Sequence, residues 1–201
     1  MKAIRERLDA VIEKYHLLNH PFYRAWSKGE LPLESIKGYA REYGSFIKEL
    51  PTGWKTLNDE HTAREEQEHF EMWCEFASYI NTTVETPSYP AVKSLLQTAR
   101  KLFSEPATAL GALYAFEAQQ PSTSSSKLQG LKTFYGITGK ETRYFEEHSK
   151  NFHEVDKILN LISRVEESEH DKIVQSCEEM CKALWDALTD LTPSHILACE
   201  N

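Results

Sequence analysis

The sequence predicts an all-α protein with a single domain, folded as a multi-helix bundle. Apolar residues recur at intervals of three and four along most of the chain, which is the spacing of one helix face. Glycine and proline are sparse, at 8 residues each in 201, and charged residues make up 27%. This balance is typical of helical proteins rather than of β-sandwiches or disordered chains. No strand-like alternation of useful length and no internal repeat is found.

The first half of the chain is divided into helices by prolines and polar breaks. An apolar stripe predicts a helix over residues 4–15, and Pro21 is suited to begin a short second helix. The LPLES stretch starts a third helix, which Pro51 interrupts or kinks because proline lacks a backbone N–H. A helix over about 62–80 ends at NTTVETPSYP, and another near 90–103 follows.

The next helix is predicted to begin at Pro106, after Ser104, and to stop at Pro121. The STSSSK segment that follows resembles a linker in composition. It is short, however, and an apolar helix continues through Leu128 and Leu131. We therefore place STSSSK inside the domain.

The last helices are expected near 139–162 and 167–191. The helical domain is then expected to span residues 1–192, and PSHILACEN, residues 193–201, is expected to be a loose C-terminal tail.

The charge pattern excludes several partner classes. The formal net charge is −8, from 31 acidic residues against 23 lysines and arginines, and no basic stripe is found. Nucleic acid and anionic membranes are therefore not expected as partners. The N-terminal MKAIRERLDAVIEKYH has no apolar core of a signal peptide, and no run reaches transmembrane length. A cytoplasmic location is expected, with four reduced cysteines: Cys74, Cys177, Cys181 and Cys199.

The segment TAREEQEHFEMW places carboxylates just ahead of a histidine. Glu66 precedes His69 by three residues and Glu65 precedes it by four, so either pair shares a helix face. Glu-x-x-His is a spacing by which helical bundles hold a pair of iron or manganese ions. The alternative is an ordinary solvated helix face.

A second candidate is Glu117, which lies in the apolar segment ALGALYAFEAQQP. A carboxylate in such surroundings is costly unless it is paired, protonated or bound to metal. The alternative is a residue at the wet end of a helix, shortly before Pro121.

The stretch HSKNFHEVD contains His148, His153 and Asp156. Five residues separate the histidines, about 140° around a straight helix, so spacing alone does not place them on one face.

Earlier in the chain, Tyr23, Tyr39 and Tyr43 are most simply core residues, although a tyrosine beside a redox metal can be oxidised. Lys127 is a surface lysine unless it enters the pocket, where burial would lower its pKa.

Several segments together resemble one family: LLNHPFYRAWSKGEL, GYAREY, EHFEMW, ALYAFEAQQP, KLQGLKTFYGI and YFEEH. They are similar to the heme-oxygenase-like diiron proteins, which include TenA- and PqqC-like members, and most of all to the group of the chlamydial protein associating with death domains. The resemblance covers about residues 5–190. It implies a bundle with a central dimetal site and the synthesis of para-aminobenzoate for folate, in which the protein cleaves and aminates its own tyrosine with O2.

The resemblance also implies roles for individual residues. The sacrificed tyrosine matches Tyr23, and the lysine that donates the amino group matches Lys127; Tyr39 and Tyr43 are further candidates for the redox chemistry. The implied metal ligands include His69, Glu117 and His148. For the first glutamate ligand we choose Glu66, with Glu65 and Glu60 as alternatives.

The chain departs from the family pattern after YFEEH, where members show His-x3-Asp-x2-His. The corresponding positions are Phe152 and Val155, which cannot bind metal. We hypothesise that a π-bulge after His148 brings His153 and Asp156 onto its face as replacement ligands. The rival hypothesis is that this half of the site is degraded.

Two iron ions or an iron/manganese pair are expected as cofactors, with O2 as co-substrate and an external reductant; a homodimer is left open. One alternative function is a TenA-like hydrolase of thiamine fragments, which needs a catalytic cysteine that has no match near the third helix. The other is a helical interaction protein without chemistry.

Overall fold

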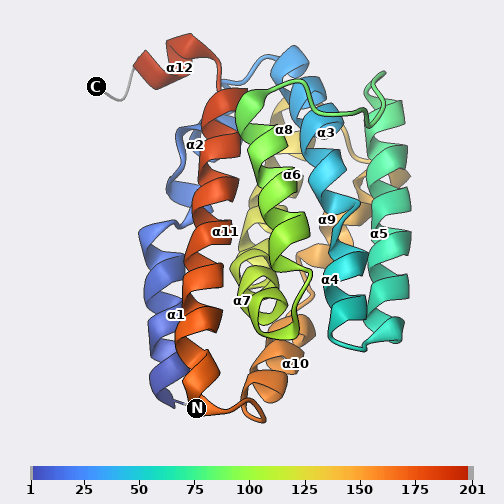
Figure 1. Ribbon diagram of the computed structural model, residues 1–201. Helices are drawn as coiled ribbons and strands as arrows, with labels where there is room; N and C mark the ends of the chain where they lie inside the picture. The colour runs from blue at the N-terminus through green and yellow to red at the C-terminus, as the bar shows by residue number, and fades with distance from the viewer. Residues whose placement is uncertain (1, 199–201) are drawn as a thin grey trace.

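The computed structural model describes residues 2–198, and within that range it contains helices and no strand (Figure 1). The longer helices are α1 (Lys2–Lys14), α2 (Pro21–Lys28), α3 (Leu33–Ile47), α4 (Leu50–Thr56), α5 (Glu60–Tyr79), α6 (Pro90–Leu102), α7 (Pro106–Glu117), α8 (Gln120–Phe134), α9 (Arg143–His148), α10 (His153–Ile162), α11 (His170–Leu191) and α12 (Ser194–Ala198). Three short 3₁₀ helices, η1 (Leu17–Asn19), η2 (Lys140–Thr142) and η3 (Glu167–Glu169), lie between them. The predicted all-α, single-domain class is confirmed.

The central helix of the bundle is α7. Every residue from Ala109 to Glu117 is buried, and the helix packs against α11, α10 and α4. The contact with α11 is close because position 111 is glycine: a Cβ there would collide with the backbone carbonyl of Ile173. A nearly all-apolar helix of this kind is stable only inside a protein, and it carries its single carboxylate, Glu117, to the centre.

Several expected boundaries agree with the structure. The third helix ends at Ile47, and Pro51 lies in the first turn of α4, where its missing N–H costs nothing. The helix expected at 62–80 is α5. The STSSSK segment is helical within α8 rather than a linker.

The predicted helix over 139–162 is wrong in its continuity. The chain forms η2, α9 and α10 there, and residues 149–152 are a non-helical turn between His148 and His153. The backbone N–H of Ser149 makes the last helix-type bond of α9, to the Phe145 carbonyl, and the N–H groups of Lys150 and Asn151 make turn bonds to the carbonyls of Glu147 and His148. Serine and asparagine favour such turns over a helix interior, so SKN is a local reason for the break.

The end of the chain also differs from the expected loose tail. Residues 194–198 form α12, which packs against α2, and Ile196 contacts the core. Residues 199–201, with Cys199, lie outside the described residues. Between residues 2 and 198, no helix has the length and apolar character needed to cross a membrane.

The core is rich in aromatic rings, as expected for the early tyrosines. Tyr39, Tyr43 and Trp73 are fully buried, and Tyr144 packs beside them. These rings fill the space between α3, α5 and α9, next to the carboxylates and histidines described below.

Candidate metal centre

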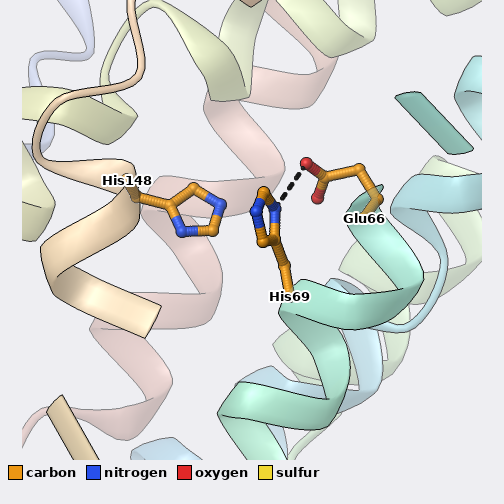
Figure 2. A group of neighbouring side chains, drawn as sticks. All are labelled: Glu66, His69 and His148. Atoms are coloured by element: carbon orange, nitrogen blue, oxygen red, sulfur yellow. Dashed lines mark hydrogen bonds and ion pairs between the residues drawn. The ribbon is translucent and has the colours of Figure 1, made fainter. Parts of the chain in front are cut away.

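Helix α5 supplies Glu66 and His69. They are three residues apart and therefore share one face of the helix. The His69 Nδ1 atom lies 2.9 Å from the Glu66 Oε1 atom, a hydrogen-bond distance (Figure 2). Burial lowers the pKa of His69, but the hydrogen bond and charge of Glu66 outweigh burial and raise that pKa overall. The other carboxylate oxygen of Glu66, Oε2, is buried without a hydrogen-bond partner.

Of the three glutamates considered as the first ligand, only Glu66 faces the interior. Glu60 is exposed, and Glu65 is half-buried. Glu65 lies 3.1 Å from His61 and 3.8 Å from Lys157 in ion pairs at the rim of α5. The choice of Glu66 therefore agrees with its position in the structure.

The last residue of α9, His148, faces His69 from the opposite side (Figure 2). The two imidazole rings are 4.4 Å apart between centroids. His148 Nδ1 lies 2.8 Å from the Tyr144 carbonyl, which can only accept, so Nδ1 carries the proton and Nε2 has a free lone pair. Burial, followed by the charge of His69, lowers the pKa of His148 to about 3. The buried Nε2 atom has no partner and is ready to bind a metal ion.

The carboxylate of Glu117 lies at the end of α7 and is only 1% exposed, so the alternative of a wet helix end is wrong. Neither of its oxygens has a hydrogen-bond partner. Burial, and then the charges of Glu154 and Glu66, raise the pKa of Glu117 well above its usual value. Such a group is stable only when protonated or when a cation neutralises it.

The structure does not bring His153 and Asp156 to this cluster. The hypothesised π-bulge is wrong, because α9 ends at His148 and α10 begins anew at His153. Both His153 and Asp156 are exposed on α10. The residue that reaches the cluster from this stretch is Glu154, which is 2% exposed.

Glu154 was not among the ligands expected from the sequence, although the sequence carries a signal for it. Glu154, Ile158 and Ile162 are spaced by four, so the glutamate lies on the apolar stripe of its own helix. His153 and Asp156 fall off that stripe. Helical periodicity counted from the start of α10, rather than from His148, would have found it.

Two groups of ligand atoms result. One atom each from Glu66, His69 and His148 lie within 4.8 Å of one another, and so do one atom each from Glu66, Glu117 and Glu154. Glu66 belongs to both groups. The donors are carboxylate oxygens and imidazole nitrogens, which suit iron and manganese. Because buried polar atoms rarely lack partners, the unpartnered oxygens and nitrogen of this cluster fit a bound metal.

A second cluster holds the tyrosines and the lysine. The hydroxyls of Tyr23 and Tyr39 are 2.9 Å apart, and Lys127 Nζ lies 3.4 Å from the Tyr39 hydroxyl. The same nitrogen is 5.4 Å from the centre of the Tyr23 ring. Tyr43 stacks on Tyr39, with centroids 4.9 Å apart. Burial lowers the pKa of Lys127 to about 7, so its amine is partly neutral at neutral pH.

Aromatic rings connect the two clusters. Trp73 lies 5.5 Å from Tyr39 and 4.8 Å from Tyr144, between ring centroids. The Tyr144 ring in turn lies 4.2 Å from the His148 ring, between centroids, and the Tyr144 hydroxyl accepts a hydrogen bond from Gln120. The tyrosine–lysine cluster is therefore in ring contact with a candidate metal ligand.

The described cysteines lie outside the two groups of ligand atoms. Cys177 and Cys181 are buried in α11, and Cys74 is half-buried on α5. None of these three belongs to either group of ligand atoms.

Comparisons with known proteins agree with the geometry. A model of a family described as iron-containing redox enzymes matches residues 52–185, and a model of the TENA/THI-4/PQQC family matches residues 5–77. The chain is 29% identical to a 4-aminobenzoate synthase of Chlamydia pneumoniae, covering 94% of this chain and 95% of the relative. It is 28% identical to a 4-aminobenzoate synthase of Nitrosomonas europaea, covering 99% and 96%.

Solved structures share the fold. A TenA homologue from Pseudomonas syringae has a TM-score of 0.78 at 13% identity, covering 94% of this chain and 91% of that one. A CADD-like protein of unknown function from Nostoc punctiforme has a TM-score of 0.71 at 19% identity, covering 100% and 97%. At these identities the likeness concerns the fold alone.

Proposed function

Because this chain belongs to a family of iron-containing redox enzymes, we propose that it is a 4-aminobenzoate synthase that oxidises and aminates its own Tyr23. The similarity to 4-aminobenzoate synthases over nearly the whole chain supports the product. The observation that carries the choice of residues is the buried amine of Lys127, 5.4 Å from the Tyr23 ring centre.

The substrate assignment follows from the chemistry of the product. Tyrosine and 4-aminobenzoate share a para-substituted benzene ring. Conversion requires cleavage of the Cα–Cβ bond, oxidation of Cβ to a carboxyl group, and replacement of the phenol oxygen by nitrogen. We take O2 as the oxidant and an external reductant as the source of further electrons. A bound pair of iron ions, or of iron and manganese, would supply the activation of O2.

The role proposed for Lys127 is amino donor. Its Nζ bonds to the oxidised ring carbon that carries the phenol oxygen, and that oxygen leaves as water. The resulting imine shifts its double bond to Cε, and hydrolysis then breaks the Lys127 Cε–Nζ bond and leaves an aldehyde on the chain. An ammonium ion has no lone pair and cannot form a bond to carbon, so the amine must first lose its proton. Burial achieves this near neutral pH, because the pKa of Lys127 is lowered to about 7. The side chain is 2% exposed, so few water molecules compete with it for an oxidised ring.

The role proposed for Tyr39 is to accept the Tyr23 proton. Burial raises the pKa of Tyr23, so the phenol does not ionise before it is oxidised. An electron must then leave together with the hydroxyl proton. The Tyr39 oxygen lies 2.9 Å away to receive that proton while the Tyr39 hydroxyl passes its own proton to the neutral Lys127 amine, which releases it again before bonding to carbon. Lys127 completes this hydrogen-bonded line. Tyr43, which stacks on Tyr39, holds that ring in place.

Placement of the substrate needs no diffusion, because Tyr23 is part of the fold. The Tyr23 side chain is 2% exposed and fixed by ring contacts with Phe22 and Tyr39. Orientation of this kind lowers the barrier by removing the entropy cost of encounter. Each chain carries one such tyrosine, so each chain makes at most one molecule of product.

The test is isotopic. Protein carrying ring-¹³C tyrosine and ε-¹⁵N lysine is loaded with iron, with or without manganese, and exposed to O2 and a reductant. We expect released 4-aminobenzoate to carry both labels and the intact mass of the chain to fall. A matched Tyr79→Phe variant, which alters an exposed tyrosine, should behave as the parent. Unlabelled product, or product from Tyr23→Phe, would exclude the assignment. Rescue of a 4-aminobenzoate auxotroph asks the same question in cells.

A further inference from the structure

The stretch after His148 contributes one buried carboxylate to the centre of the bundle, Glu154. It lies in the first turn of α10, and α10 packs against α7, the helix that carries Glu117. Its apolar neighbours on the same stripe, Ile158 and Ile162, are fully buried. The fold therefore holds Glu154 inside by packing, whatever the cost of burying its charge.

That cost is not met by hydrogen bonds. Oε1 of Glu154, Oε2 of Glu66 and both oxygens of Glu117 are buried without a partner. A buried polar atom that lacks a partner costs about 1–3 kcal/mol, and more when it is charged. Two explanations remain: Glu117 and Glu154 share a proton, or a cation lies among the three carboxylates.

Counting charges shows what the cation explanation requires. If ionised, Glu66, Glu117 and Glu154 bring three negative charges into one small volume. A single divalent cation at the histidines, held by Glu66, His69 and His148, leaves one net negative charge and no cation among the oxygens of Glu117 and Glu154. A second cation among the carboxylates removes the net negative charge, and it also accounts for the two Glu117 oxygens that have no hydrogen-bond partner.

Distances are compatible with this second position. One oxygen from each of Glu66, Glu117 and Glu154 lies within 4.8 Å of the others. Oxygen ligands at about 2.1 Å from a cation are about 3.0 Å apart when they lie at right angles and about 4.2 Å apart on opposite sides. Glu66 has one oxygen beside His69 and the other free, so it is able to bridge both positions.

We infer that Glu154 is a metal ligand, and that the centre has two unlike positions bridged by Glu66. One position contains the nitrogens of His69 and His148, and the other takes only carboxylate oxygens from the protein. This inference rests on the proposed metal centre but not on the proposed product. Oxygen-only positions favour hard divalent cations such as Mn²⁺, whereas imidazole adds affinity for ions such as Co²⁺.

The test measures metal binding directly. Metal-free protein is titrated with Co²⁺, followed by its visible spectrum, and with Mn²⁺, followed by electron paramagnetic resonance and calorimetry. We expect two equivalents in the parent chain. Glu154→Gln, which keeps the shape of the side chain, should retain the histidine-bound Co²⁺ spectrum and lose the second equivalent, with affinity reduced by about 100-fold or more. The matched control Asp156→Asn alters an exposed carboxylate of the same helix and should still bind two.

A complementary variant guards against loss of folding. His148→Gln should lose the histidine position and still bind Mn²⁺ at the carboxylates, with an unchanged helical circular dichroism spectrum. Two equivalents in Glu154→Gln, or one in the parent chain, would overturn the inference. Failure to make 4-aminobenzoate while two ions bind would leave the inference standing and reject the proposed function. Product formed by a chain that binds one ion would support the proposed function and reject the inference of two metal positions.

Discussion

The Lys127 amine lies 5.4 Å from the centre of the Tyr23 ring, and both side chains are 2% exposed. Amine and phenol thus share one dry compartment, with Tyr39 in hydrogen-bond contact with each.

Lys127→Met should abolish 4-aminobenzoate formation, because the variant keeps the length of the side chain and removes the nitrogen. Product is measured after a single exposure to O2 and reductant. Lys132→Met is the control: Lys132 lies on the same helix but forms an exposed ion pair with Glu146. Labelled product from Lys127→Met at the parent's yield would show that the nitrogen has another source.

Lys127→Met should also stabilise the fold in a pH-dependent way. The pKa of Lys127 is about 7 in the folded chain and 10.5 in the unfolded chain. Below pH 10.5 the unfolded chain therefore binds a proton on Lys127 that the folded chain does not, and burial of this side chain lowers the free energy of unfolding. This cost grows as the pH falls to about 7. The gain from the substitution should be roughly 2 kcal/mol larger at pH 7 than at pH 9. Urea denaturation at both pH values measures it. An equal gain in the free energy of unfolding at pH 7 and pH 9 would mean that Lys127 is not buried as a neutral amine.

Tyr39→Phe should slow product formation by about 100-fold or more, because Tyr23 loses the acceptor for its proton. Tyr43→Phe removes a hydroxyl from the ring stacked on Tyr39 but keeps the stack, so its effect should be less than about 10-fold. Single-turnover rates, with metal content checked in parallel, compare the two. Equal rates for both variants would contradict the proton role of Tyr39.

Glu117→Gln should melt at a higher temperature than the parent when both are metal-free at pH 7. The folded pKa of Glu117 is raised above that of the unfolded chain. Its contribution to stability is therefore complete below about pH 4.5 and is lost as pH rises. The difference between the two proteins should shrink toward pH 4. Added iron should reverse the order at pH 7, since the amide is a weaker ligand. Scanning calorimetry of all four samples checks this.

His69→Ala should lose metal affinity, whereas His153→Ala should bind as the parent does, because His153 is exposed on α10. Both are measured by metal analysis after dialysis against a weak chelator. A loss of on the order of 100-fold is expected for His69→Ala. If both variants lost metal affinity equally, the structure would be contradicted and His153 would again be a candidate ligand.

Much of the fold was predictable because its signals are local. The stripes and prolines marked most helices, including the break at Pro51 and the helical nature of STSSSK. The turn at residues 149–152 was not predicted, because apolar spacing continues on both sides of it. That single error moved the expected ligands from Glu154 to its exposed neighbours.

The candidate site shows the same division between local and long-range information. Glu66 and His69 share one helix, so their spacing was enough to place them together. The neighbourhood of Glu117 and Glu154 depends on packing between α7 and α10, which no spacing along the chain describes. The burial of Lys127 likewise follows from the contact of α8 with α2, which seals the Tyr23 compartment.

The burial of Tyr23 sets the fate of the chain after the proposed reaction. Removing a large aromatic side chain from a packed core costs about 3–5 kcal/mol, a large part of the stability of a typical domain. A spent chain should therefore unfold readily, release its product as it does so, and be degraded faster than a fresh one. The supply of product would then follow the rate at which ribosomes make the protein, not the concentration of any free precursor.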